Sequence, residues 1–364
     1  MRFHHTAGKD TPRFHLSLKR GRQALVAAVG ALLLGQAQAT TVLTFSDHQP
    51  LDGMRTRFLD EVFFPAVERE SEGRLKIERH WDGELAIAYD ALPTLRSGKT
   101  DLSVIVPEYK ANDLPLHQIF KGFPVGPSGA RQVDFFREVY REVPAFNQEL
   151  ASNNIREVFL ATGYPSGFFG TRPLQSIGDI EGQKWRSASF WHLDFLKSAG
   201  AQPVKMHWGP EIFDALGNGA LDGIFVNIDS AYNLKLNQAA PYALVSPRLW
   251  LGHLYIVGIN EKVWETLPQE DQAAFQRAAE TSYQQLGQVM DTSYTNMVKQ
   301  LEAGGTKVRT LTDEEVAHWL KATDYQQHQQ SWAKSEALKD VEAQPVIDQV
   351  ARILEKYSES GTAQ

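Results

Sequence analysis

A stretch of 36 residues near the carboxyl end constrains the fold more than any other feature of the chain. Residues 268–303 contain no proline after Pro268, and the pair Gly304–Gly305 follows them. Proline suits the first turn of a helix, acidic residues suit its positive end, and glycine commonly ends it. At about 1.5 Å per residue such a helix is about 54 Å long, more than a small domain spans. We therefore predict that it crosses two domains, either as one helix or as two shorter helices broken at Gly287.

The rest of the chain alternates between strand and helix patterns, which is typical of α/β domains. A first series has predicted strands at 41–46, 74–80 and 100–107 and predicted helices at 54–73 and 89–98. A second series has predicted strands at 156–165, 182–187, 201–206 and 221–228 and predicted helices at 191–200 and 209–219. An apolar strand at 250–260 is expected to lead back to the first series. The pattern predicts two α/β lobes joined by the long helix.

The amino-terminal 39 residues have the three parts of a secretory signal peptide. A basic segment at 19–23 precedes 12 apolar residues at 24–35, and small residues stand at 37 and 39. Twelve residues are too few to cross a bilayer, which needs about 20. We predict export to the periplasm with cleavage near Ala39; the alternative is an uncleaved anchor.

Charge and composition exclude several classes of function. Without 1–39 the chain has 31 basic and 43 acidic residues, a net charge of −12, which argues against nucleic acid as a partner. The absence of cysteine excludes disulfides, thiolate catalysis and Cys-type zinc sites. No H-E-x-x-H pair or G-x-S-x-G elbow occurs, so we expect no metal, no cofactor and no enzymatic activity.

Five segments in order resemble the solute-binding proteins of tripartite ATP-independent periplasmic (TRAP) transporters, the DctP-like family. They are ERESEGRLKIERHWDGELA (68–86), LRSGKTDL (95–102), RPLQSIGDIEGQKWR (172–186), PEIFDALGNGALDG (210–223) and VGINEKVWETLPQEDQAAFQRAA (257–279). The resemblance implies an α/β periplasmic binding protein with two lobes, hinge strands and one long helix spanning both. It also implies capture of a small organic anion by lobe closure and delivery to the membrane subunits of a TRAP permease.

The expected organisation follows from this resemblance together with the patterns above. After the signal peptide, lobe I takes 40–162, with 252–267 and parts of the C-terminal segment returning to it. Lobe II takes 163–251, the bridging helix 268–303, and a helical C-terminal segment 304–364. We expect a monomer. Two other functions stay open at this point: a periplasmic ligand-sensing subunit for a signalling receptor, and an exported enzyme.

Arg186 is the residue to which the resemblance assigns the ligand carboxylate. It stands in GQKWRS, on the family's G-x-K-x-R stretch. A planar guanidinium donates two parallel hydrogen bonds to a carboxylate and so fixes its orientation as well as its charge. Some relatives have a second pocket arginine at the position of Ser166. Because this sequence has one such arginine and not two, we predict that the ligand has a single carboxylate.

The resemblance and the positions of strand ends give the other candidate site residues. Ligands of open α/β sheets collect beyond the carboxyl ends of strands. Six further residues are expected to contact the ligand: His48, Tyr89, Tyr109, Tyr164, Trp208 and Asn227. Four weaker candidates are Ser166, Arg172, Phe225 and Asp229, of which Arg172 also fits a loop or salt-bridge role.

Overall fold

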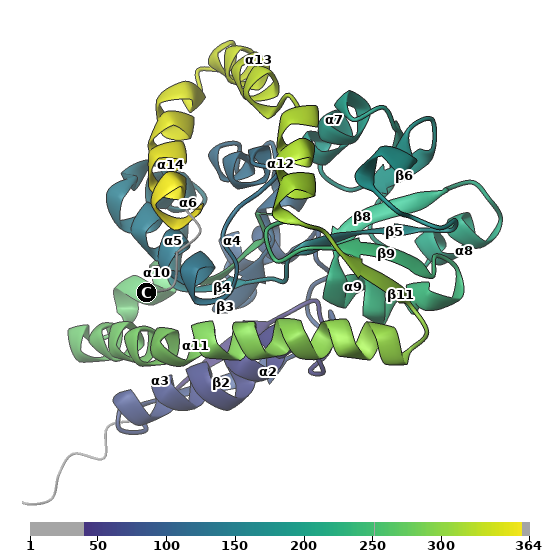
Figure 1. Ribbon diagram of the computed structural model, residues 1–364. Helices are drawn as coiled ribbons and strands as arrows, with labels where there is room; N and C mark the ends of the chain where they lie inside the picture. Colours follow the sequence, from purple (N-terminus) through teal and green to yellow (C-terminus); the bar gives the residue numbers. More distant parts are fainter. Residues whose placement is uncertain (1–39, 251, 359–364) are drawn as a thin grey trace, which may run out of the picture. The chain divides into compact units, whose positions relative to one another are not determined.

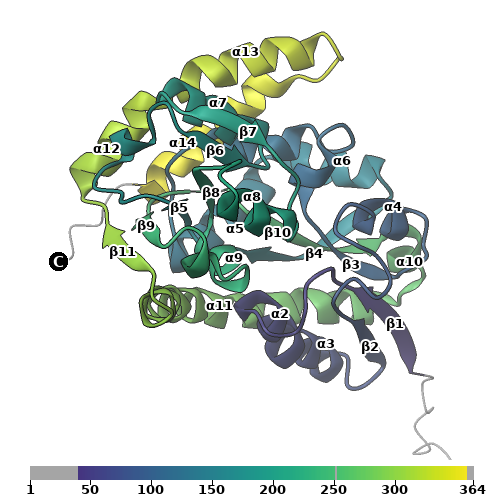
Figure 2. The ribbon, with the colours of Figure 1, turned by 90° about the vertical axis from the view of Figure 1, so that its right-hand side faces the viewer.

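The computed structural model describes residues 40–250 and 252–358, which form two sheets, each covered by helices on both faces (Figures 1 and 2). The predicted signal peptide at 1–39 lies outside the described residues. Among the described residues, no helix is both long enough and apolar enough to cross a membrane.

The first sheet has the strand order β2-β1-β3-β10-β4. Its strands are β1 (Thr41–Ser46), β2 (Leu75–His80), β3 (Leu102–Ile105), β4 (Ile155–Thr162) and β10 (Leu254–Asn260). β1 is parallel to β2 and β3, whereas β10 is antiparallel to β3 and β4. These strands lie in the predicted segments, and β10 returns to the first series as expected. The strand pattern placed β4 in the second series, whereas it belongs to this first sheet because it pairs with β10.

Helices cover both faces of this sheet because its strands bury side chains in both directions. One face packs against α2 (Met54–Phe58), a π-helical turn (Leu59–Phe63) and α3 (Phe64–Glu70). The other packs against α4 (Ala91–Arg96), η3 (Leu116–Gly122), α5 (Gly129–Glu142) and α6 (Pro144–Ser152). Two short helices, η2 (Pro107–Lys110) and α10 (Glu261–Thr266), follow β3 and β10.

The second sheet has the order β11-β9-β5-β8-β6-β7. Its strands are β5 (Ser166–Gly170), β6 (Lys184–Ser187), β7 (Gln202–Lys205), β8 (Gly223–Asn227), β9 (Tyr242–Val245) and β11 (Lys307–Thr310). β6, β7 and β8 are parallel, and β5 is antiparallel to β8 and β9. Its helices are η4 (Ile177–Ile180), α7 (Phe190–Ser198), α8 (Glu211–Gly217), α9 (Ile228–Asn233) and η5 (Leu236–Gln238).

The long helix α11 (Gln269–Ala303) runs without a break over 35 residues, so the alternative of two helices broken at Gly287 is wrong (Figure 1). Phe275 and Met290 join the core of the first lobe, whereas Leu301 joins the core of the second. Gly287 is packed against α5, because a Cβ added there would lie 2.6 Å from the Cβ of Ala130. The glycine permits close approach of two helices and does not break one.

The C-terminal segment is less uniform than predicted. It begins with a strand, β11, which pairs with β9 at the edge of the second sheet. Three helices follow: α12 (Asp313–Ala322), α13 (Tyr325–Ala337) and α14 (Ala343–Ser358). α12 buries Val316 and Trp319 in the second lobe, and α14 packs on α5 of the first. The segment therefore contacts both lobes.

Candidate functional site

A cavity of about 40 Å³ lies between the two lobes. Five of the predicted ligand contacts line it, and so does one of the weaker candidates: His48, Tyr109, Arg186, Trp208 and Asn227, with Phe225. His48 follows β1, Tyr109 lies in η2 after β3, and Trp208 follows β7. The carboxyl ends of parallel strands from both sheets thus meet at one place, as the general rule for α/β sheets predicts.

Arg186 is almost completely buried, with 2% of its surface exposed. Its Nε and Nη2 atoms donate hydrogen bonds of 3.0 and 2.7 Å to the carbonyl oxygen of Met206, and its Cζ lies 5.7 Å from the centre of the Trp208 ring. No carboxylate of the described residues lies within 4 Å of it. Because a guanidinium has five N–H donors, Met206 leaves several of them for another acceptor.

The histidines of the cavity are neutral near pH 7, so they add no positive charge. Burial lowers the pKa of His48 to about 4, although the Asp47 carboxylate opposes this shift. Burial also lowers the pKa of His192 and of His253, and the Lys121 ammonium adds to both shifts. Desolvation disfavours the charged imidazolium in each case. Among the residues that line the cavity, Arg186 is therefore the one cation.

A buried carboxylate of the first lobe, Glu108, lines the same cavity as Arg186. Glu108 pairs with Lys121 at 2.6 Å and with the Nε2 atom of His253 at 3.1 Å. Burial by itself would raise the pKa of Glu108, but Lys121 and His253 outweigh it and hold that pKa well below its usual value. The cavity wall thus contains a neutralised anion at one point and an arginine without a carboxylate at another.

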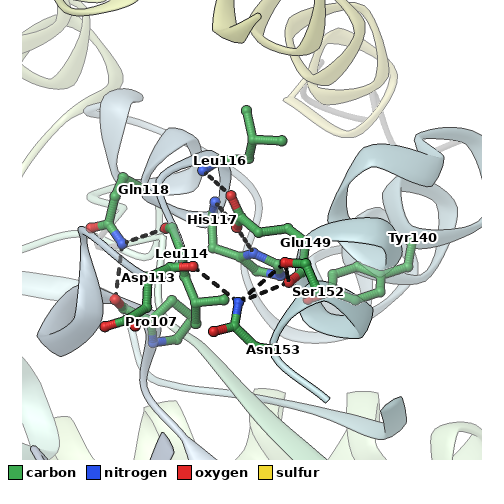
Figure 3. A network of polar contacts seen from close by, with 10 residues as sticks. All are labelled: Pro107, Asp113, Leu114, Leu116, His117, Gln118, Tyr140, Glu149, Ser152 and Asn153. Carbon is green, nitrogen blue, oxygen red and sulfur yellow. Dashed lines mark hydrogen bonds and ion pairs between the residues drawn. The ribbon is translucent and has the colours of Figure 1, made fainter. Parts of the chain in front are cut away.

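Polar contacts behind the cavity fix the helices that carry Glu108 and Lys121, and Figure 3 shows them. Gln118 in η3 donates to the carbonyl oxygens of Pro107 at 2.9 Å and Leu114 at 3.0 Å, which joins η3 to η2. His117 lies between Glu149 of α6 and the Tyr140 hydroxyl of α5, the latter at 2.8 Å. The site is therefore built on a segment held by two neighbouring helices.

Asn227 ends β8 and directs its amide toward Asp229 at the start of α9. Its Nδ2 donates to an Asp229 carboxylate oxygen, and β8 pairs it with Ser166. Burial raises the pKa of Asp229 to about 6, although the Ser230 backbone and the Asn227 amide oppose this shift. Asn227 lines the cavity, whereas Asp229 lies behind it as a hydrogen-bond partner.

The structure does not bring the remaining candidates to this cavity. Tyr89 lines an adjoining cavity of about 430 Å³, which shares Glu108, Tyr109, Ala188 and Ser189 with the first. Tyr164 is buried in the core of the second lobe, and Ser166 is fully buried in β5. Arg172 is exposed, and its Nη2 lies 3.8 Å from Asp222, an arrangement that matches the loop or salt-bridge role.

Other lining residues were not among the predicted ones. They are Gln49, Glu108, Ser187, Ala188, Ser189, His192, Val226, Ser230, His253 and Tyr255. His253 and Tyr255 stand at the amino end of β10, which is antiparallel to β3 and therefore begins where β3 ends. His253 and Tyr255 could have been predicted as site residues only if the sequence had shown that β10 pairs with β3. The described residues contain no group of three or more His, Cys, Asp or Glu that could hold a metal ion.

Comparison with known proteins places these features in a family. The profile described as "Bacterial extracellular solute-binding protein, family 7" (DctP) matches residues 52–335. The C4-dicarboxylate-binding periplasmic protein DctP of Rhodobacter capsulatus is 30% identical over 149 residues, which are 40% of this chain and 44% of that protein. The chain thus matches less than half the length of this relative.

A second relative and a solved structure extend the likeness. The monocarboxylate 2-oxoacid-binding periplasmic protein of a Nostoc species is 25% identical over 266 residues, 70% of each chain. A TRAP solute binding protein from Rhodoferax ferrireducens, in complex with copurified benzoate, superposes with a TM-score of 0.75. That match covers 88% of this chain and 99% of the other at 17% identity, so it supports the two-lobed fold.

Proposed function

Because this chain belongs to family 7 of the bacterial extracellular solute-binding proteins, we propose that it captures a small monocarboxylate between its lobes and delivers it to a TRAP permease. The protein works as a monomer, in the periplasm, and releases its ligand chemically unchanged. The observation that carries this proposal is the buried guanidinium of Arg186, which lines the cavity and has no carboxylate partner among the described residues.

The single cation of the cavity favours a ligand with one carboxylate. A second carboxylate would lie near Glu108, whose own charge is already balanced by the Lys121 ammonium and which also hydrogen-bonds to the neutral His253. A like charge without a cation of its own is costly in a buried site. The relatives include a C4-dicarboxylate-binding protein, a monocarboxylate 2-oxoacid-binding protein and a protein in complex with benzoate. The charge balance of this cavity favours ligands of the last two types.

The size of the cavity supports capture by lobe closure. Its volume of about 40 Å³ is far below the roughly 300–1,000 Å³ of typical ligand sites. A ligand with a ring therefore requires the lobes to move apart and then close. The chain crosses between the sheets at 163–165, between β9 and β10, and along α11. We place the movement at these crossings. Closure is favoured when the ligand contacts both lobes in the closed form.

A thermal-shift screen against a panel of organic acids tests the proposal. We expect monocarboxylates with a small or aromatic body to raise the melting temperature, and the corresponding dicarboxylates and neutral amides to have no effect. Native mass spectrometry of the same mixture identifies the bound acid and shows whether it is recovered unchanged. If no organic acid binds, or if amides bind as well as acids, the proposal is wrong.

Variants of two arginines locate the acid. Arg186→Ala should weaken binding by at least about tenfold, since a hydrogen bond to a charged group contributes about 1.5–3 kcal/mol. Arg186→Lys keeps the charge but not the planar pair of donors, and should recover only part of the affinity. Arg172→Ala is the matched control, because Arg172 is exposed and lies outside the cavity. Equal affinity in Arg186→Ala and Arg172→Ala would remove Arg186 from the site.

A further inference from the structure

A second cavity of about 700 Å³ opens on the first lobe and shares no lining residue with the interlobe cavity. Its walls are formed by α5, α6, β4, α10 and α11, which lie together in Figure 1. We call it the lateral groove. Its volume falls within the range of small-molecule sites, about 300–1,000 Å³. Nothing in the proposed transport function uses it.

A β-bulge lies beside the one acidic residue that β4 contributes to the lateral groove. Val257 of β10 is opposite Phe159, but the next residue, Gly258, is opposite Glu157, so Val158 has no partner. Bulges of this kind redirect neighbouring side chains and often stand beside functional sites. Glu157 lines the groove and is half-buried.

Glu157 differs from the other charged residues of the groove because its carboxylate lacks a partner. The arginines of the rim are each paired with a glutamate: Arg137 with Glu280 at 2.5 Å, Arg156 with Glu261 at 2.6 Å, and Arg141 with Glu142 at 3.0 Å. Within the described residues the Glu157 side chain has no hydrogen bond and no ion pair. Burial raises the pKa of Glu157 to about 7, and the nearby Arg156 only partly opposes this. A half-buried carboxylate without a counter-ion is costly unless a ligand supplies one.

Aromatic rings beside Glu157 supply apolar surface. Tyr140, Tyr283 and Trp264 all line the groove. The backbone N–H of Leu160 donates a 2.7 Å hydrogen bond to the Tyr283 hydroxyl, which holds that ring against β4. Tyr140 is held from behind by His117. Phe159 stacks on one face of Tyr283, and the Arg137 guanidinium lies over the ring at 4.5 Å, so Tyr283 offers a ligand its edge and not a free face. The Arg156 guanidinium lies over the Trp264 ring at 5.4 Å in the same way. Fixed ring edges next to an unpaired carboxylate suit a ligand with a cationic group and an apolar body.

We propose that the lateral groove binds a small organic ammonium ion, whose N–H groups donate to Glu157 and whose apolar body packs against the edges of the Tyr140 and Tyr283 rings. The chain then has two sites of opposite preference: an acid site between the lobes and an amine site on the first lobe. The second site does not depend on the first, because the two cavities have no residue in common.

Calorimetry with two matched probes tests this inference. 2-Phenylethylammonium and its neutral analogue 2-phenylethanol have the same ring and differ in the charged group. At about pH 8, where Glu157 is ionised, we expect the amine to bind saturably at one site and the alcohol not to bind. Glu157→Gln should weaken amine binding at least about tenfold. Glu302→Gln, an exposed change on α11 outside the groove, should leave it unchanged.

Two further variants keep the test independent of folding and of the acid site. Ala151→Trp places a ring into the groove from an exposed position of α6 and should also abolish amine binding. Arg186→Ala should remove the interlobe acid site and leave amine binding intact. The inference is overturned if the amine does not bind, if the alcohol binds equally well, or if Glu157→Gln and Ala151→Trp retain full affinity. If Arg186→Ala abolishes amine binding and the two groove variants do not, the amine binds between the lobes, and the inference is also overturned.

Discussion

Replacing Gly287 by alanine sets helix propensity against packing, and the structure decides which effect wins. Gly287 lies in the interior of α11, where alanine is normally favoured by about 1 kcal/mol. The added Cβ would lie 2.6 Å from the Cβ and 2.7 Å from the Cα of Ala130, well inside the normal carbon–carbon separation of about 3.5–4.0 Å. Because one of these atoms is backbone, no rotamer change relieves the contact. Overpacking of this kind costs about 1–3 kcal/mol.

The expected result for Gly287→Ala is a net loss of up to about 2 kcal/mol in the free energy of unfolding, which is the overpacking cost less the gain in helix propensity. Urea unfolding followed by far-ultraviolet circular dichroism measures it. Gly217→Ala is the matched control: Gly217 is the last residue of helix α8, and an added Cβ there meets no atom within 4 Å. It should gain up to about 1 kcal/mol.

A double variant tests whether Ala130 is the cause. Ala130→Gly removes the Cβ at 2.6 Å but leaves the Cα at 2.7 Å, so Gly287→Ala should recover part of its stability in that background. An interaction energy of about 1 kcal/mol is expected for residues in contact. If Gly287→Ala is as stabilising as Gly217→Ala, α5 and α11 are not in close contact at this point, and a packing role for Gly287 is refuted.

Three further predictions concern titration and capping. The pKa of His48 is lowered to about 4, so His48 contributes stability above pH 6.5 that is lost as the pH falls toward 4. The variant His48→Asn should therefore lose less stability at acid pH than the wild type, measured as melting temperature against pH. The pKa of Glu157 is raised from 4.5 to about 7, so wild-type stability should fall as the pH rises through this range. Glu157→Gln should remove that fall, by at most about 3 kcal/mol, and an unchanged curve would show that Glu157 is well solvated. Thr312 accepts a hydrogen bond from the Glu315 backbone N–H in a capping box at the start of α12, so Thr312→Ala should cost about 1 kcal/mol in urea unfolding, and no cost would rule out a role for this cap.

The sequence predicted those elements whose signals are local. The long helix was visible because proline and glycine mark its ends, and β1 was visible because its side chains alternate. β5 was missed because all five of its residues, SGFFG, are buried, so neither alternation nor a polar face distinguishes it. β9 and β11 have only four residues each, and β11 forms a strand only through its pairing with β9.

The site residues also differ in whether they can be predicted from local sequence or only from the folded chain. His48, Tyr109 and Asn227 follow strands, and the position of a residue after a strand can be read from the chain; the structure places them around one cavity, while their contact with a ligand stays a prediction. The charge of that cavity could not be read in this way. Arg186 is its one cation because burial keeps the lining histidines neutral, and it has no carboxylate partner among the described residues because Glu108 pairs with the Lys121 ammonium and hydrogen-bonds to His253. These two partners lie 13 and 145 residues away from Glu108 along the chain, and only the pairing of β10 with β3 and the docking of η3 on η2 bring them together. The residue that attracts the ligand can be predicted from a motif, but its lack of competing partners is a property of the folded chain.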